Sequence, residues 1–174
     1  DRSLFRRYVV AALATYYGGL VVCFLLPTAP PWLAGQTGAL PHVFRVAEDL
    51  YGNVSPEVYD YAYSVAGTNS VAAMPSLHQA IAMLIALAAS RVHPIIAVAG
   101  WLYAVSMGIA LVYTGEHYVV DLLAGAALAW GAWRVAGWRT LAYDDSPRSR
   151  AERAQSEPIS PKAIPPQHLT TPSK

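Results

Sequence analysis

Two short stretches of the chain carry ionisable side chains at the start of apolar segments. The first, TGEHYVVD, places His117 four residues before Asp121, so that on a helix the two side chains share one face. A carboxylate so placed can accept from one ring nitrogen of His117, fix its tautomer and leave the other nitrogen as a nucleophile. The second, AMPSLH, contains His78, which can protonate a departing alkoxide. Together these groups suit phosphoryl transfer through a phosphohistidine.

The helix expected after AMPSLH is also suited to hold an anion. The first turn of a helix exposes free N–H groups and the positive end of the helix dipole, which favour phosphate. Pro75 fits the first helical position, because the N–H that proline lacks has no helical partner there. We therefore expect the amides of Ser76, Leu77 and His78 to face an oxyanion, while the Ser76 hydroxyl also suits a helix cap.

Composition indicates which elements must position these residues. The chain has 174 residues, of which 55% are hydrophobic and 13% charged, and this charged share is about half that of soluble domains. Each of four apolar segments is close to the ~20 residues that a membrane-spanning helix needs; they cover residues 8–26, 71–90, 92–113 and 117–138. The sequence therefore predicts an all-α, polytopic membrane helix bundle with four transmembrane helices.

Domain boundaries follow from the same composition. We expect one transmembrane domain over residues 1–143, in which a long loop at 27–70 separates the first two helices. The tail over 144–174 is rich in Pro, Ser and Arg, buries too little apolar surface to fold, and is predicted to be disordered.

The distribution of Lys and Arg predicts an orientation. If the four helices alternate in direction, most of the cations fall on one side of the membrane. They lie near both termini and in the turn between segments 71–90 and 92–113: Arg2, Arg6, Arg7, Arg91, Arg134, Arg139 and those of the tail. The other side has one cation, Arg45. The positive-inside rule then places both termini in the cytoplasm and the long loop on the extracytoplasmic face. His78, His117 and Asp121 would meet on that outer face.

AMPSLH and YTGEHYVVD resemble the second and third motifs of the type-2 phosphatidic acid phosphatase superfamily, which read Pro-Ser-x-His and Ser-Arg-x5-His-x3-Asp. With PTAPPW upstream, the form here is most similar to the inositol phosphorylceramide synthase (aureobasidin-resistance) branch, over about residues 27–133. The resemblance implies that His117 is the nucleophile, Asp121 its partner and His78 the general acid and base, with Ser76 contacting phosphate. It also implies a six-helix core, so we expect two further helices upstream of this chain.

The chain departs from the phosphatase pattern in its cations. Ala110 and Leu111 stand where the phosphatases have Ser-Arg, and there is no Lys-x6-Arg-Pro motif, since both lysines lie in the tail. Arg45 is therefore our candidate for binding donor phosphate, unless it serves only to pair with Glu48 or Asp49. Glu116 is expected at the solvated rim of the site.

These observations predict an integral membrane enzyme that acts on a lipid phosphate or phospholipid without metal or cofactor. The reaction is transfer of a phospho-head-group of the inositolphospho type, or hydrolysis of a lipid phosphate. A net charge of +1 gives no indication of nucleic acid binding. Two alternatives stay open: His78, His117 and Asp121 could form a metal triad, or the protein is a non-catalytic relative, as the missing cationic motifs would suggest.

Overall fold

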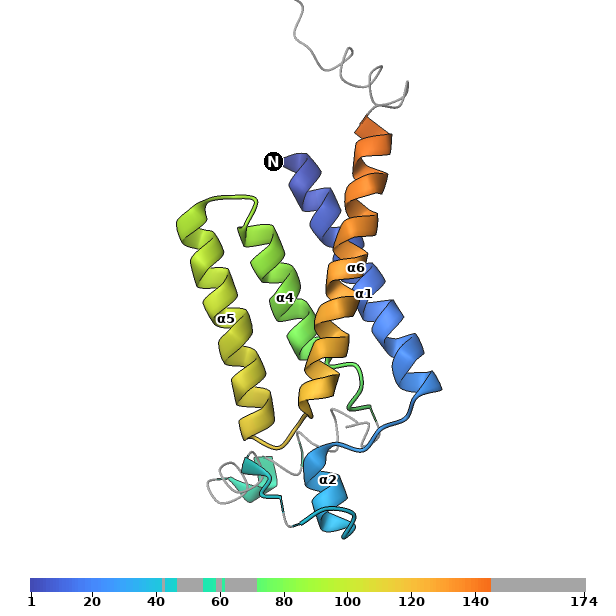
Figure 1. The fold of residues 1–174 in the computed structure, drawn as a ribbon, viewed down its shortest axis with the longest axis vertical. Coiled ribbons are helices and arrows are strands. Elements are labelled where there is room, and N and C mark those ends of the chain that lie inside the picture. The colour runs from blue at the N-terminus through green and yellow to red at the C-terminus, as the bar shows by residue number, and fades with distance from the viewer. Residues whose placement is uncertain (42, 47–54, 59–60, 62–71, 145–174) are drawn as a thin grey trace, which may run out of the picture. The chain divides into compact units, whose positions relative to one another are not determined.

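A computed structural model describes residues 1–41, 43–46, 55–58, 61 and 72–144. The helices are α1 (Arg2–Leu25), α2 (Pro31–Gln36), α4 (Leu77–Ala89), α5 (Pro94–Tyr113) and α6 (Val119–Asp144) (Figure 1). The described residues contain no β-strand apart from an isolated bridge, which confirms the all-α prediction. The chain divides at Thr140 into two units, and the site described below lies in the first. All of the predicted tail except Asp144 falls outside the described residues.

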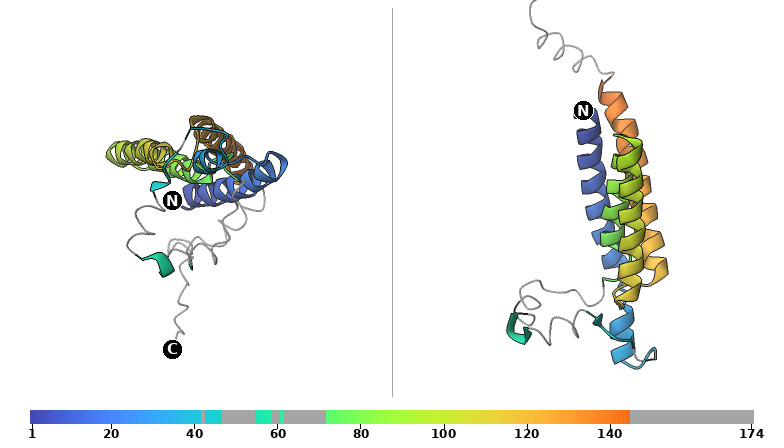
Figure 2. Two further views of the ribbon diagram at one scale, coloured as in Figure 1. Left: turned by 90° about the horizontal axis from the view of Figure 1, so that it is seen from below. Right: turned by 90° about the vertical axis from the view of Figure 1, so that its left-hand side faces the viewer.

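Within the first unit, the long helices run in alternating directions along the bundle. The N-terminus and the turn between α4 and α5 lie at one end, and α2 and the α5–α6 connection lie at the other (Figures 1 and 2). Helices α4 and α6 therefore both begin at the end that carries α2. This arrangement brings the two motifs together, although they are separated in sequence by a helical hairpin.

Small residues allow the helices to approach closely around α4. One buried cluster joins Ala11 of α1 and Leu84 of α4 to Ala129 and Trp133 of α6. A second cluster packs Ala82 and Ala86 of α4 against Ala104 of α5. Helix α4 is thus the central helix of the described bundle, and the alanines on several of its sides account for its close neighbours.

Among the described residues, three helices are long and apolar enough to cross a membrane, which is consistent with an integral membrane protein. They are Arg2–Leu25, Pro94–Tyr113 and Val119–Trp138. Helix α4 has only 13 residues, so the prediction of four full spans is not confirmed. The predicted span over residues 71–90 is wrong in its first part, because residue 72 pairs with Thr28 in a parallel bridge and the helix begins only at Leu77.

Arg7, near the N-terminus, lies beside the later part of α6, as the alternating arrangement predicts. The Nε and Nη2 atoms of Arg7 donate to the Trp133 carbonyl at 3.2 and 3.1 Å. The guanidinium also lies over the Trp133 ring, 4.1 Å from its centroid. These contacts hold α1 to α6. The assignment of this end of the bundle to the cytoplasm stays a prediction.

Candidate active site

The connection between α5 and α6 fixes the backbone of His117 to the end of α5. Gly115 adopts the left-handed conformation (φ +74°) that favours glycine after a helix. Its amide and that of Glu116 donate to carbonyls of the last turn of α5 at 3.1 Å each, forming a Schellman motif. The His117 amide donates to the Leu111 carbonyl at 3.2 Å. The left-handed glycine thus turns the chain so that His117 directly follows a closed helix end.

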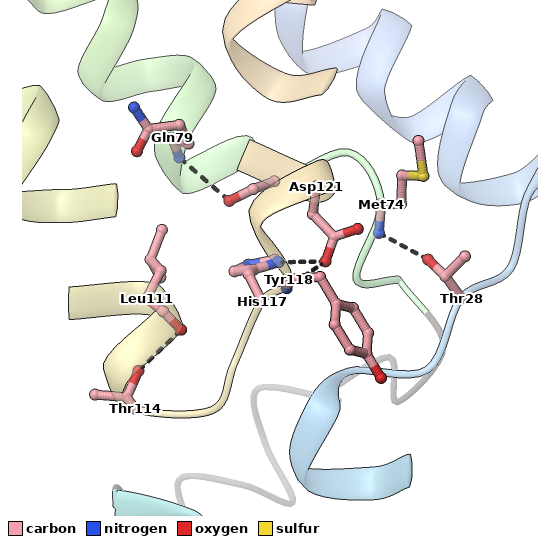
Figure 3. Close-up of polar contacts among 9 residues, drawn as sticks. Thr28, Met74, Gln79, Leu111, Thr114, His117, Tyr118 and Asp121 are labelled. Carbon is pink, nitrogen blue, oxygen red and sulfur yellow. Dashed lines mark hydrogen bonds and ion pairs between the residues drawn. The ribbon is translucent and has the colours of Figure 1, made fainter. Parts of the chain in front are cut away.

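Asp121 links this connection to the start of α6. Its Oδ2 atom accepts from the Tyr118 amide at 2.8 Å, as the acidic residue of a capping box does. The same oxygen lies 3.7 Å from Nδ1 of His117 (Figure 3). His117 precedes α6, so the prediction that both residues share a helical face is wrong. The cap nevertheless brings the ring and the carboxylate together, slightly beyond hydrogen-bond distance.

Both members of this pair are buried, His117 at 9% exposure and Asp121 at 1%. Burial is the largest influence on His117 and lowers its pKa, while the Asp121 charge acts in the opposite direction. A histidine nucleophile must be neutral, since a protonated ring has no free lone pair. The lowered pKa favours the neutral ring of His117 at neutral pH, which is the form that a histidine nucleophile would need.

His78 and His117 approach each other from the two motifs. His78 lies in the first turn of α4 with an exposed side chain. Its ring centroid is 6.2 Å from that of His117, and the two ring planes are inclined at 61°. The rings are therefore close enough to act on opposite sides of one phosphoryl group, and His78 is the one that solvent and substrate reach more easily.

Ser76 is the cap of α4. Its hydroxyl is fully buried and accepts from the Gln79 amide at 3.3 Å. Its own amide donates to the Asp121 carbonyl at 3.0 Å, so the prediction that this amide faces an anion is wrong. The prediction for Pro75 is also wrong, because Pro75 precedes the cap instead of opening the helix. The amides of Leu77 and His78 remain in the first turn.

Gly125 allows α6 to pass directly against this cap. A Cβ atom at Gly125 would overlap the Ser76 carbonyl oxygen, so any larger residue would push the two helices apart. Gly125 follows Asp121 by about one helical turn. The close approach thus sets the distance between the two motifs.

Thr28 anchors the extended segment that precedes α4. Its hydroxyl accepts from the Met74 amide at 2.8 Å, and its carbonyl accepts from the Ala73 amide at 3.1 Å (Figure 3). Sequence reasoning noted PTAPPW only for its resemblance and missed this role. A threonine among prolines was the available signal, because it supplies a hydrogen-bonding group where the prolines have no N–H.

Arg45 lies against the connection that carries His117. Its Nε atom is 3.4 Å from Oε1 of Glu116, and its guanidinium lies 3.9 Å from the centroid of the Trp32 ring. The Trp32 amide donates to the Gly115 carbonyl at 3.1 Å, which attaches α2 to the same connection. Glu116 is thus a half-buried partner of Arg45, not the solvated rim residue expected. The alternative partners Glu48 and Asp49 lie outside the described residues.

The metal alternative gains no geometric support from the described residues. Among them, no three His, Cys, Asp or Glu side chains form a group that could hold a metal ion. Asp121 uses one oxygen for the Tyr118 amide, and the two histidine rings are inclined to each other. The choice between a nucleophile with a proton donor and a ligand triad stays a prediction.

Apolar helices bring two histidines and a carboxylate together at the starts of α4 and α6, an arrangement compatible with a membrane phosphatase or phosphotransferase. The chain belongs to the PAP2 superfamily, whose sequence model matches residues 1–135. It is similar to a phosphoinositol dihydroceramide synthase of Bacteroides thetaiotaomicron, with 30% identity over 150 residues. The match covers 76% of this chain and 46% of the relative, so the chain spans about half of that protein. No solved structure matches the chain significantly.

These comparisons confirm the resemblance read from the two motifs, including the synthase branch. The family match and the similar relative indicate an enzyme of the phosphatase and phosphotransferase class.

Proposed function

We propose that this protein transfers a phospho-head-group of the phosphoinositol type from a lipid donor to an alcohol acceptor, through a phosphohistidine at His117. The observation that carries the proposal is that the His117 ring is close to both partners, with Nδ1 3.7 Å from the Asp121 carboxylate and the ring centroid 6.2 Å from that of His78. The similarity to a phosphoinositol dihydroceramide synthase supports a phosphoinositol donor group and a dihydroceramide-type alcohol as acceptor.

In the first step, Nε2 of His117 attacks the donor phosphorus and the bond from phosphorus to the lipid oxygen breaks. His78 gives its proton to the departing alkoxide. The Asp121 carboxylate stabilises the positive charge that develops on the His117 ring. The first-turn amides of α4 and the positive end of its helix dipole stabilise the negative charge on the phosphoryl oxygens.

In the second step, the acceptor hydroxyl replaces the departed alcohol. His78, now neutral, takes the hydroxyl proton, and the acceptor oxygen attacks phosphorus while the bond to His117 breaks. The enzyme is regenerated with His78 protonated and His117 neutral. Water in place of the acceptor would give hydrolysis, so the chemistry at His117 is common to a transferase and a phosphatase. We place the reaction on the extracytoplasmic face, as the arginine distribution predicts.

The reaction is expected to be independent of metal and sensitive to vanadate. Orthovanadate forms a five-coordinate adduct that resembles the phosphoryl group during attack by histidine. Turnover of a phosphoinositol lipid in mixed micelles should therefore fall with orthovanadate and remain unchanged with EDTA. Inhibition by EDTA that zinc or manganese reverses would instead favour the metal alternative.

The donor is expected to be a phosphodiester rather than a phosphate monoester. Each charge-assisted hydrogen bond to phosphate contributes about 1.5–3 kcal/mol, and Leu111 takes the place of an arginine that would provide one in the phosphatases. Arg45 would then be the main cation at the donor, so Arg45→Ala should raise KM for the donor more than it lowers kcat.

Steady-state kinetics of the full-length protein with two lipids of matched acyl chains, a phosphoinositol diester and a phosphate monoester, measure this preference. Arg6→Ala is a matched control, because it removes a cation at the opposite end of the bundle. Faster turnover of the monoester, together with no effect of Arg45→Ala, would identify a lipid phosphatase whose phosphate-binding cations come from outside this chain.

A further inference from the structure

Arg45 and Glu116 form a charge pair directly beside the nucleophile. The Arg45 side chain is 9% exposed, with Nε 3.4 Å from the Glu116 carboxylate and the Trp32 ring covering the guanidinium at 3.9 Å. Glu116 immediately precedes His117, and the hydrogen bond that its backbone amide donates to the Leu111 carbonyl holds it in place. Both the cation and its partner are therefore fixed by the elements that fix His117.

The Glu116 carboxylate lies within electrostatic reach of any phosphoryl group on His117. Consecutive Cα atoms are about 3.8 Å apart, and the screening length at physiological salt is ~8 Å. In agreement, Glu116 is among the charges that oppose the burial-driven lowering of the His117 pKa, although its contribution is the smallest of them. The carboxylate thus reduces the net positive charge that Arg45 presents to a substrate.

Monoesters and diesters of phosphate differ in the charge that such a pair must accommodate. A monoester carries about −1.5 to −2 at neutral pH, because its second pKa is about 6, whereas a diester carries one negative charge. An arginine that is already paired with a carboxylate favours the binding of a phosphate with one negative charge and opposes a second negative charge on it. Glu116 has no role in the motif resemblance or in the proposed mechanism.

We infer that Glu116 is a specificity-determining residue, whose carboxylate, paired with Arg45, makes the site select singly charged phosphodiester lipids over doubly charged monoesters. The inference rests on the proposed function, since it refines the donor class of the same site. Glu116 acts through its pairing with Arg45, and it need not touch the reacting atoms.

The test is a measurement of binding that does not depend on turnover. The probes are a lipid phosphonate and its monomethyl ester, with the same acyl chains, at a pH at which the phosphonate is doubly ionised. Affinities for the full-length protein and its Glu116→Gln variant are measured in micelles. Glutamine keeps the shape of the side chain and an oxygen that can accept from Arg45, but it removes the charge. The ratio of affinities, dianion over monoanion, should rise about tenfold, which corresponds to about 1.4 kcal/mol.

Three further variants separate charge from structure. Glu57→Gln removes an exposed carboxylate from the segment that connects α2 to α4 and should leave the ratio unchanged. Glu116→Asp keeps the charge and should retain most of the wild-type selectivity. In an Arg45→Ala background, Glu116→Gln should change the ratio much less than in the wild type, because the pair no longer exists.

An affinity ratio that stays within twofold in Glu116→Gln would overturn the inference, whatever the activity of the protein. An equal effect of Glu116→Gln with and without Arg45 would overturn the role of the pair. If the ratio shifts as expected but the wild type turns over no phosphoinositol lipid, the proposed function fails and the charge selection stands.

Discussion

Replacing His117 by alanine is expected to remove nearly all turnover while the protein still folds. The ring is the only candidate nucleophile that the described structure places against a buried carboxylate, with Nδ1 3.7 Å from Asp121. Without it, neither transfer nor hydrolysis can pass through a phosphohistidine. The measurement is release of the donor alcohol from a phosphoinositol lipid by the purified full-length protein.

Because His117 is buried, alanine leaves a cavity, and His117→Gln provides a second variant of more similar size. His93→Ser is the matched control, because His93 caps α5 at the opposite end of the bundle and serine retains a capping oxygen. Elution volume and thermal unfolding report the fold. Substantial activity in either His117 variant, in a preparation free of host phosphatases, would contradict the assignment of the nucleophile.

Asp121→Asn is expected to lower kcat/KM by about 10²–10⁴, by analogy with the carboxylate that orients a catalytic histidine in hydrolases. The asparagine oxygen can still accept from the Tyr118 amide, which Asp121 binds at 2.8 Å, so the start of α6 should survive. The charge that stabilises the developing cation on His117 is lost. If the amide group rotates, its NH₂ also faces Nδ1 and favours the wrong tautomer.

Kinetics and thermal unfolding of the same preparation separate these roles of Asp121. Unchanged unfolding with a large loss of rate would support catalytic positioning. A loss of rate below threefold would mean that Asp121 serves the capping box and the packing of α6 alone. Asp121→Ala, which removes both functions, should lower stability as well.

The two motifs could be predicted because their signals are local. The spacing of His117 and Asp121, and the serine and histidine that follow Pro75, are readable within a few residues. The hydrophobic lengths of α1, α5 and α6 also predicted elements close to those observed. The geometry around His117 was harder to predict from the sequence. The same spacing of His117 and Asp121 fits a pair on one helix and also a histidine that precedes a capped helix. Only the left-handed turn at Gly115 distinguishes the two.

The contacts that complete the site join distant parts of the chain, and no local pattern specifies them. Thr28 binds the backbone of Met74, and Arg45 contacts Glu116 across 71 positions. The start of α4 was misplaced for the same reason, since an apolar run of 71–90 has the composition of a helix throughout. The bridge to Thr28 takes residue 72 out of it, and the Ser76 cap then sets its first residue.

The short length of α4 has a consequence for the level at which the chemistry takes place. Its 13 residues extend about 20 Å, whereas the hydrocarbon core of a bilayer is about 30 Å thick. If the Arg91 end reaches one interface, the first turn of α4 stops about 10 Å short of the other. Residues 72–74 then descend through a layer with little water, where unpaired backbone groups are costly, and Thr28 satisfies two of them. A lipid would thus reach the two histidines by lateral diffusion within its leaflet. Entry of the lipid into the site should be slower in thicker membranes.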